Sequence, residues 1–407
     1  MTSRRRGFAE RRKGRGFNQE EFAEAVGVDR STVQRWETGK NDPQPWQRPR
    51  IAKALAVTAN ELVALLAPDV RVPSKPLNRW LTVVPQGDDD EFNALELARR
   101  VSASDVGKET LVRLEDAFDE LAMLYPVSPP QELLERVRKH TAYVAHLMDA
   151  RMTLAEQRRL YVVGGWFQLL GATLHIDLKQ EHAATARLQT AETLARHAEH
   201  SEIRAWCHET DAWRVLTDGA YGRALDLSQA AQELAPAGSS VAVQATAQEG
   251  RARARLGDSK GVHLAIDKVE RMSAVLEPVK NAKHHYQYEP GKSLAYTATT
   301  LAWIGDPAAE TYAREVIAGL APADDAQKWP RRIASANIDL ALALLVDDRP
   351  DEACDAVQRA ILSGRVVPSN HWRALEVVRA VEARKLPEAP DLREAYQGMS
   401  SLGTGER

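Results

Sequence analysis

The sequence predicts an all-α protein made of a small N-terminal helical domain and a longer array of helix pairs. Alanine, leucine, arginine and glutamate dominate the 407 residues, whereas aromatic residues make up only 6%. This composition favours helices over sheets. Helix-capping patterns recur along the chain. In the C-terminal part, aspartate-containing turns recur about every 40 residues, and such a period with two helices per unit is typical of an α-solenoid.

The first 66 residues contain signals for five short helices. A first helix is expected over Arg4–Lys13, with Gly16 closing it. Asn18 and Glu21 form an Asn-x-x-Glu capping box. This box predicts that a second helix begins at Gln19 and continues to Val26.

A tight turn and a third helix follow. Gly27 permits the positive φ that such a turn requires, Asp29 is expected to cap the helix, and Gly39 ends it. Val33 and Trp36 occupy the predicted buried face. The opposite face is polar and carries Arg30, Ser31, Gln34 and Arg35. The last two helices of the domain are expected over Pro45–Ala56 and from Thr58, paired with Glu61 in a capping box, to Leu66.

These residues resemble the lambda-repressor-like helix-turn-helix domain of the XRE (Cro/C1) regulator family. The likeness covers residues 4–66 and depends on Gly16–Ala23, Gly27–Val28, Ser31–Val33 and Trp36–Gly39. The resemblance implies a double-stranded DNA partner and a homodimer, because one such domain reads only a half-site. Arginine and glutamine can make bidentate contacts to bases in the major groove. The DNA-binding residues that the resemblance implies are Gln19, Arg30, Ser31, Thr32, Gln34, Arg35, Lys40 and Asn41.

The charge of the chain is unevenly distributed. The net charge is −3, yet residues 1–66 contain 13 Lys/Arg against 8 Asp/Glu. Seven basic residues precede Phe17: Arg4, Arg5, Arg6, Arg11, Arg12, Lys13 and Arg15. A basic arm of this kind suits phosphate contacts, and a solvated arm without a partner is an equal alternative.

A proline-rich stretch separates the two parts. Residues 67–91 contain Pro68, Pro73, Pro76 and Pro85 and an acidic run, Asp88–Glu91, which predicts an extended connector. We therefore expect a DNA-binding domain over 1–66, a linker over 67–91, a helical connecting region over 92–153 and a repeat domain over 154–396. In the connecting region, helices are expected to begin at Ser104 and at a Ser128–Gln131 capping box.

The repeat domain has turn markers at spacings of 41, 40, 48 and 42 residues. These are Asp177, Asp218, Asp258, Asp306 and Asp348. Alanines at helical spacing follow each marker, so paired helices can approach closely. This region, Leu154–Lys385, resembles tetratricopeptide-repeat (TPR) domains with longer units; a non-repetitive bundle is the alternative.

Domains of this type bind peptides or proteins along a concave face lined by the first helix of each pair. Polar and aromatic residues on those helices are the candidates for a ligand groove: Trp166, Trp206, His208, Trp213, Tyr296, Arg332 and Asn337. Packing between helices is the alternative role for each tryptophan. The longest interval contains the insertion Asn281–Pro290, which we expect to be an exposed connector rather than a ligand-contacting loop.

No pattern in the sequence indicates catalysis, a metal or a cofactor. Gly291-Lys292-Ser293 resembles the end of a phosphate-binding loop, but Tyr286 replaces the required glycine and no strand precedes it. Two pairs of nearby histidines, His197 with His200 and His284 with His285, lack further ligands at the spacing of a metal site. The two cysteines lie far apart, and the longest apolar run near the C-terminus is far shorter than a membrane span. We expect a cytoplasmic, non-enzymatic protein without a membrane segment.

The combination resembles peptide-responsive XRE regulators with TPR-like C-terminal domains. It implies a sequence-specific DNA-binding transcriptional regulator whose repeat domain binds a peptide, small ligand or protein and modulates DNA binding. The alternative is a TPR-like interaction scaffold with a vestigial or protein-binding helix-turn-helix head.

Overall fold

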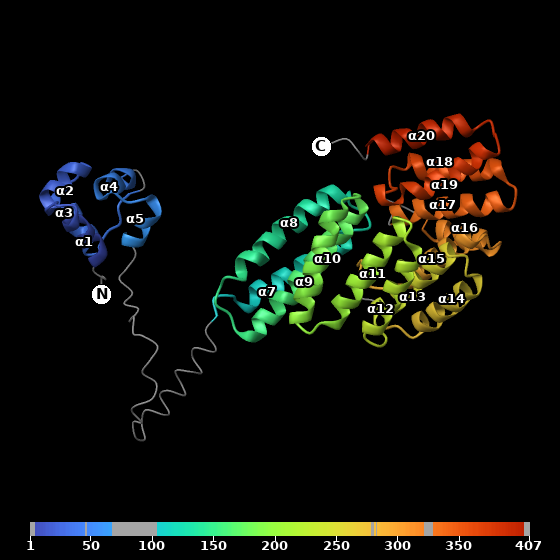
Figure 1. Ribbon diagram of the computed structural model, residues 1–407, viewed down its shortest axis with the longest axis horizontal. Coiled ribbons are helices and arrows are strands. Elements are labelled where there is room, and N and C mark those ends of the chain that lie inside the picture. Colours follow the sequence, from blue (N-terminus) through green and yellow to red (C-terminus); the bar gives the residue numbers. More distant parts are fainter. Residues whose placement is uncertain are drawn as a thin grey trace, which may run out of the picture. The chain divides into compact units, whose positions relative to one another are not determined.

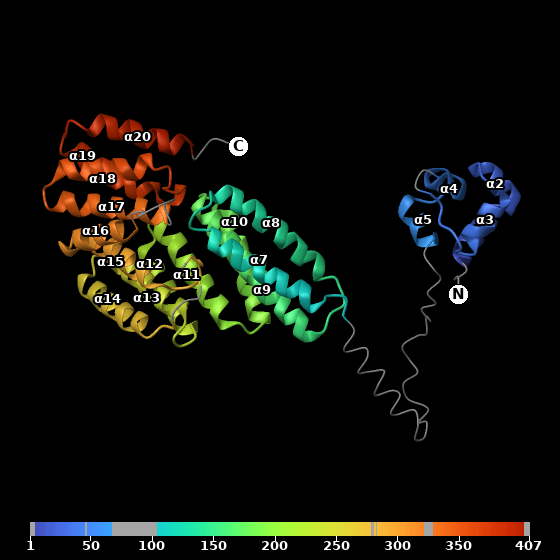
Figure 2. The same ribbon diagram turned by 180° about the vertical axis from the view of Figure 1, so that it is seen from behind.

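The computed structural model describes residues 5–44, 47–66, 104–277, 281, 283–320 and 329–402. The chain divides into two compact units, Met1–Asp90 and Glu91–Arg407. Within the described residues every regular element is helical, so the all-α prediction is confirmed (Figures 1 and 2). The predicted linker at 67–91 and the prolines that suggested it lie outside the described residues.

The N-terminal unit has five helices around one core. They are α1 (Arg6–Gly14), α2 (Gln19–Val26), α3 (Arg30–Glu37), α4 (Arg48–Leu55) and α5 (Ala59–Leu66). Phe8, Phe22, Val33, Ile51 and Leu55 are completely buried. One core therefore joins the first four helices, and Leu62 and Leu66 add α5 to it.

The predicted helix ends agree best with the structure where a side chain caps the helix backbone. Asn18 accepts from the backbone N–H groups of Glu20 and Glu21, and Glu21 accepts from Asn18, so the capping box is complete. Asp29 occupies the N-cap of α3 but makes no side-chain cap hydrogen bond. The fourth helix begins at Arg48 and not at Pro45; Pro45 itself lies outside the described residues.

The C-terminal unit starts with α7 (Lys108–Leu124) and α8 (Pro130–Leu147). Two expected starts are wrong. Ser104 forms a local turn in which its hydroxyl accepts from the N–H of Val106, and α7 begins only after Gly107. Ser128 lies one residue too early to cap α8, whose N-cap is Pro129.

Six helix pairs follow and stack in chain order. Their members are α9 (Leu154–Asp177) and α10 (Glu181–His197), α11 (Ser201–Thr217) and α12 (Tyr221–Leu234), α13 (Ser240–Arg255) and α14 (Ser259–Ala274), α15 (Pro290–Ile304) and α16 (Ala308–Leu320), α17 (Pro330–Val346) and α18 (Pro350–Leu362), and α19 (His371–Ala383) and α20 (Ala389–Leu402). A short 3₁₀ turn, η1 (Pro368–Asn370), precedes α19. The first helices of successive pairs contact one another from α9 to α19, which is the arrangement of a helical repeat domain (Figure 1).

Small residues allow this stacking. Ala224, Ala353, Ala356 and Ala360 are completely buried between helices, as the alanine spacing predicted. All five aspartate markers lie at or beside inter-helix turns. Asp177, the last residue of α9, is the most buried of the five and is 3% exposed.

Candidate DNA-recognition helix and ligand pocket

The turn between α2 and α3 determines which face of α3 is free. Gly27 has φ +76°, and the N–H of Val28 donates to the carbonyl of Ala23 at 2.9 Å. Val33 and Trp36 are buried against the core. The second of these helices is therefore anchored by its apolar face, and its polar face points away from the domain core.

That polar face carries the predicted reading residues. Arg30, Ser31, Gln34 and Arg35 are exposed. Their side chains make no hydrogen bond or ion pair within the described part of the chain. They are thus free to contact another molecule. Lys40 and Asn41 are also exposed, next to the end of α3, whereas Thr32 is half-buried.

A carboxylate that the sequence reasoning did not single out braces the domain. Glu37, at the end of α3, accepts from Arg12 Nε at 2.7 Å and from Gln19 Nε2 at 2.6 Å. Arg12 is 3% exposed and also donates to the carbonyl of Phe17. Glu37 therefore joins α1, the start of α2 and the end of α3, and it accepts one of the two amide N–H groups of Gln19.

Part of the predicted basic arm has an internal role. Arg5 is 8% exposed and donates to the carbonyls of Trp36 and Asn41 and to Asp42. Arg11 donates to the carbonyls of Leu55 and Ala56. Lys13 and Arg15 remain exposed. Neither a wholly phosphate-binding arm nor a wholly solvated one is therefore correct, because three of its arginines bind the domain itself.

A pocket opens in the C-terminal unit where the first helices of the pairs converge. It contains about 1350 Å3 of space not filled by protein atoms, counting its open mouth. Its walls come from α9, α11, α13, α15, α17 and α19, with the end of α7. Four of the predicted groove residues line it: Trp206, Trp213, Tyr296 and Arg332.

The other three candidates lie elsewhere. Trp166 packs in the core, where its ring stacks on Phe118 with a centroid distance of 5.3 Å. His208 is half-buried on α11 and does not line the pocket. Asn337 lines a separate depression between α17 and α18. Its amide is held there by the carbonyl of Ile333 at 2.9 Å and by Arg359 Nε at 3.2 Å.

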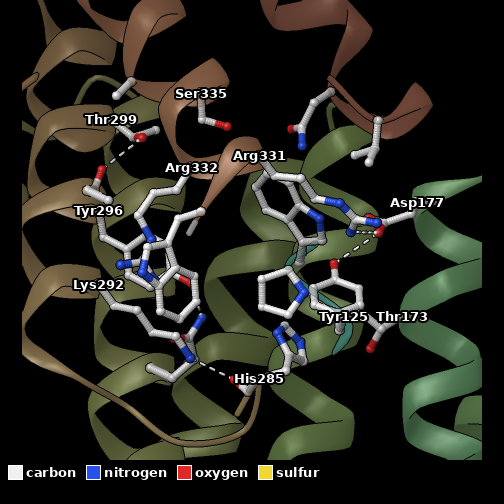
Figure 3. Close-up of a pocket in the computed structure, with 18 of the residues that line it drawn as sticks. Tyr125, Thr173, Asp177, His285, Lys292, Tyr296, Thr299, Arg331, Arg332 and Ser335 are labelled. Carbon is white, nitrogen blue, oxygen red and sulfur yellow. Dashed lines mark hydrogen bonds and ion pairs between the residues drawn. The ribbon is translucent and has the colours of Figure 1, made fainter. Parts of the chain in front are cut away.

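Charged pairs line one side of the pocket. Arg331 Nη1 and the hydroxyl of Tyr125 both donate to Asp177 Oδ2, each at 3.0 Å. Burial raises the pKa of Asp177, and Arg331 opposes that shift. Figure 3 shows Tyr125, Asp177 and Arg331 together on one side, with Lys292, Tyr296 and Arg332 on the other.

Further charges lie deeper in the same pocket. Arg373 and the hydroxyl of Thr299 both donate to Asp339, which is 1% exposed. Four charged residues that line the pocket were not among the groove candidates predicted from the sequence: Asp177, Glu209, Lys292 and Asp339. The available signal was an acidic residue inside an otherwise apolar helix, as in α17, where Asp339 lies between Ile338 and Leu340.

The insertion expected to be an exposed connector is largely buried, so that prediction is wrong. We name residues 283–289 the strap. His284, Tyr286 and Tyr288 are between 2% and 7% exposed. Tyr286 packs in the core beside Trp166 and Trp206. Aromatic side chains of this size stabilise the fold when buried. Lys283, His284 and His285 of the strap also line the pocket.

The fold and the free face of α3 define the class of the N-terminal domain, and comparison with known families agrees. The family described as "Helix-turn-helix" matches residues 8–62. This part of the chain is an XRE-type helix-turn-helix domain, a class of DNA-binding domain.

Among solved structures, the chain is similar to Bacillus thuringiensis PlcR, whose crystal structure is a complex with the peptide PapR7 and DNA. The sequences are 12% identical over 99% of this chain and 94% of that chain, with a TM-score of 0.26. A score this low does not establish a common overall arrangement. Comparison with curated proteins finds no match.

Two kinds of feature are absent from the described residues. No helix among them is long and apolar enough to cross a membrane. They also contain no group of three or more His, Cys, Asp or Glu side chains placed to hold a metal ion.

Proposed function

We propose that the protein is a sequence-specific transcriptional regulator whose repeat domain binds a small molecule, peptide or protein and thereby modulates DNA binding. The observation that carries the DNA part is the polar face of α3, where Arg30, Ser31, Gln34 and Arg35 are exposed without partners among the described residues. A helix fits the major groove, and arginine and glutamine there distinguish bases.

The remaining contacts follow from this placement. Lys40 and Asn41 would hold the phosphate backbone beside the reading helix, and Thr32 would contact either backbone or base. Gln19 would contribute its amide oxygen and its second amide N–H, since Glu37 accepts only one of the two. A domain of this class reads a half-site, so we propose a homodimer on a two-part operator, acting in the cytoplasm.

The pocket supports the effector part of the proposal. It is lined by the first helices of six successive pairs and collects aromatic and charged side chains. Enclosed sites with a few convergent polar groups are the usual form of a ligand site. Its walls belong to different helix pairs, so an occupant would restrain the angles between them.

Selection from random DNA duplexes by the full chain tests the reading role. We expect an enriched two-part sequence at physiological salt. Arg30→Ala and Arg35→Ala should each reduce discrimination against the wrong base by about 1–3 kcal/mol. Arg138→Ala on α8 removes an exposed cation outside the head and is the matched control.

A uniform loss of affinity on every duplex would mean that both arginines contact only phosphate. No enrichment at all, together with a weak salt dependence of binding, would favour the interaction-scaffold alternative.

A further inference from the structure

The pocket holds more cationic groups than it has carboxylates to pair with them. Three arginines have partners: Arg331 with Asp177 at 3.0 Å, Arg332 with Glu289 at 2.6 Å, and Arg373 with Asp339. Of the other Lys and Arg side chains that line the pocket, Lys283 and Arg365 are exposed. Arg251 and Lys292 are buried, and neither has a carboxylate within ion-pair distance among the described residues. Burying a charge without a partner is energetically unfavourable, so the burial of Arg251 and Lys292 needs an explanation.

Arg251 lies in the pocket wall and has a hydrogen-bond donor without an acceptor among the described residues. It is 7% exposed, and its guanidinium lies 4.9 Å from the ring centroid of Trp213 and 4.2 Å from that of Tyr296. These two rings fix the guanidinium by cation–π contact. Its Nε is enclosed and has no hydrogen-bond acceptor among the described residues. A guanidinium has a planar set of donors that matches a carboxylate.

Lys292 is held by neutral groups alone. It is 7% exposed, and its ammonium donates to the carbonyls of His285 and Gln287, both at 2.7 Å. An ammonium has three donors, so one remains for another acceptor. Burial, with the neighbouring Arg332, lowers the pKa of Lys292 to about 7, while Glu289 and Glu209 act in the opposite direction.

Glu209 is a buried carboxylate whose charge interacts with both Arg251 and Lys292, and its hydrogen bond goes to another residue. It accepts from Gln244 Nε2 at 2.9 Å, and the same nitrogen donates to the hydroxyl of Tyr296 at 3.0 Å. Burial raises the pKa of Glu209, and Arg251 and Lys292 act against that shift. One carboxylate cannot neutralise two cations, so the site retains capacity for an added anion.

The rest of the lining is suited to a flat apolar group. Trp206, Trp213, Trp329, Tyr125 and Tyr296 face this space. Aromatic rings contribute large apolar contact area with defined geometry.

We propose that the pocket binds a small aromatic carboxylate, whose carboxylate is received by Arg251 and Lys292 and whose ring lies against the tryptophan and tyrosine side chains. This assignment rests on the proposed function, because it names the chemistry of the effector that the repeat domain is proposed to bind. The ligand's negative charge supplies the partner that the two cations lack.

Calorimetric titration of the full-length protein tests the charge requirement. The probes are 2-naphthoate and 2-naphthamide, which share shape but differ in charge. We expect the carboxylate to bind at least about tenfold more tightly, since a hydrogen bond to a charged group contributes roughly that much or more. Equal binding of the two, or no binding of either, overturns the proposal.

Variants locate the site. Arg251→Gln should weaken naphthoate binding by about tenfold or more. Arg251→Lys should recover part of that affinity, because lysine restores the positive charge but not the planar set of guanidinium donors. Arg314→Gln removes an exposed arginine on α16, outside the pocket, and should leave binding unchanged. Circular dichroism of each variant confirms folding. Folded Arg251→Gln protein that binds like the parent overturns the proposal.

The pH dependence gives an independent readout. A bound anion raises the pKa of Lys292, so binding takes up a proton when the solution pH exceeds about 7. Naphthoate affinity should therefore fall as pH rises from about 7 to about 9, by up to about tenfold per unit. Lys292→Met should abolish that dependence, although His284, His285, Glu209, Glu289 and Arg332 still surround the site. An unchanged pH profile in the variant contradicts the assignment of Lys292.

Two outcomes separate this proposal from the broader function. If naphthoate binds through Arg251 but leaves operator affinity unchanged, the ligand chemistry stands and modulation of DNA binding fails. If a peptide with a free C-terminal carboxylate binds and naphthoate does not, the aromatic-carboxylate assignment is wrong while the regulatory function stands.

Discussion

Replacing Lys292 by methionine should change how the stability of the ligand-free protein depends on pH. Burial lowers the pKa of Lys292 from 10.5 to about 7. Because the folded-state pKa is lower than the unfolded one, the unfolded chain binds more protons between about pH 7 and about pH 10.5. Folding stability from this group is therefore lowest below pH 7 and rises with pH.

The magnitude follows from the size of the shift. Each pKa unit corresponds to about 1.36 kcal/mol, so protonated Lys292 costs the folded state on the order of 4 kcal/mol at neutral pH and below. Between about pH 7.5 and about pH 9.5 the parent should gain roughly 2–3 kcal/mol relative to Lys292→Met. The variant leaves the carbonyls of His285 and Gln287 without their donor. The loss of these two hydrogen bonds, about 1–3 kcal/mol for each, opposes the stability that the variant gains by removing the buried charge. The absolute stability of the variant is therefore not diagnostic, and the change of its unfolding free energy with pH is the quantity to compare.

Urea unfolding followed by tryptophan fluorescence measures this slope in buffers free of aromatic carboxylates. Lys260→Met on α14 removes an exposed lysine and is the control; its stability should run parallel to that of the parent. Parallel curves for the parent and Lys292→Met would refute the reasoning, since they would show that Lys292 titrates alike in the folded and unfolded chains.

Two further predictions concern the N-terminal domain. Glu37→Ala should destabilise it by about 3 kcal/mol, because Arg12, which is 3% exposed, loses its carboxylate partner. Thermal unfolding followed by circular dichroism measures this change, with Glu24→Ala at an exposed position as the control. An equal effect of the two substitutions would refute the bracing role of Glu37. Gly27→Ala should cost about 1–2 kcal/mol, because its φ of +76° disfavours any residue with a Cβ. Gly14→Ala, at a helical glycine with nothing within 4 Å of an added Cβ, should instead be neutral or stabilising in the same assay.

Local signals predicted the N-terminal domain well. Asn18 and Glu21 cap α2 as expected, and Gly27 adopts the left-handed conformation that the turn requires. These features depend on neighbouring residues, which a sequence shows directly. The brace through Glu37 was not predicted, because its partners Arg12 and Gln19 lie 25 and 18 residues away.

The pocket was predictable only in part. The concave face of a repeat array is lined by the first helix of each pair, so Trp206, Trp213, Tyr296 and Arg332 could be selected from their positions. Asn337 occupies the same kind of helix, yet it faces α18 and its amide is held by Ile333 and Arg359. Spacing does not distinguish these faces when a helix is buried on nearly all sides, as α17 is.

The strap shows the limit most clearly. Its two histidines and two tyrosines suggested an exposed connector, since loops are ordinarily exposed. In the structure it fills the space beside Trp166 and Trp206 and supplies the carbonyls that hold Lys292.

By itself, the sequence determined that this protein is all-helical, that its first domain is of the helix-turn-helix class with Arg30, Ser31, Gln34 and Arg35 on the free face of α3, and that helix pairs recur behind it. Those conclusions depend on periodicity, caps and turns, which act over a few residues. Only the tertiary structure decided that Asp177 pairs with Arg331, 154 positions away, and that Arg251 and Lys292 share a pocket without enough carboxylates. Such pairings result from the stacking of the helix pairs, which brings together residues that are far apart in the sequence. Because burial removes water from these charged groups, each one must be stabilised by such a partner.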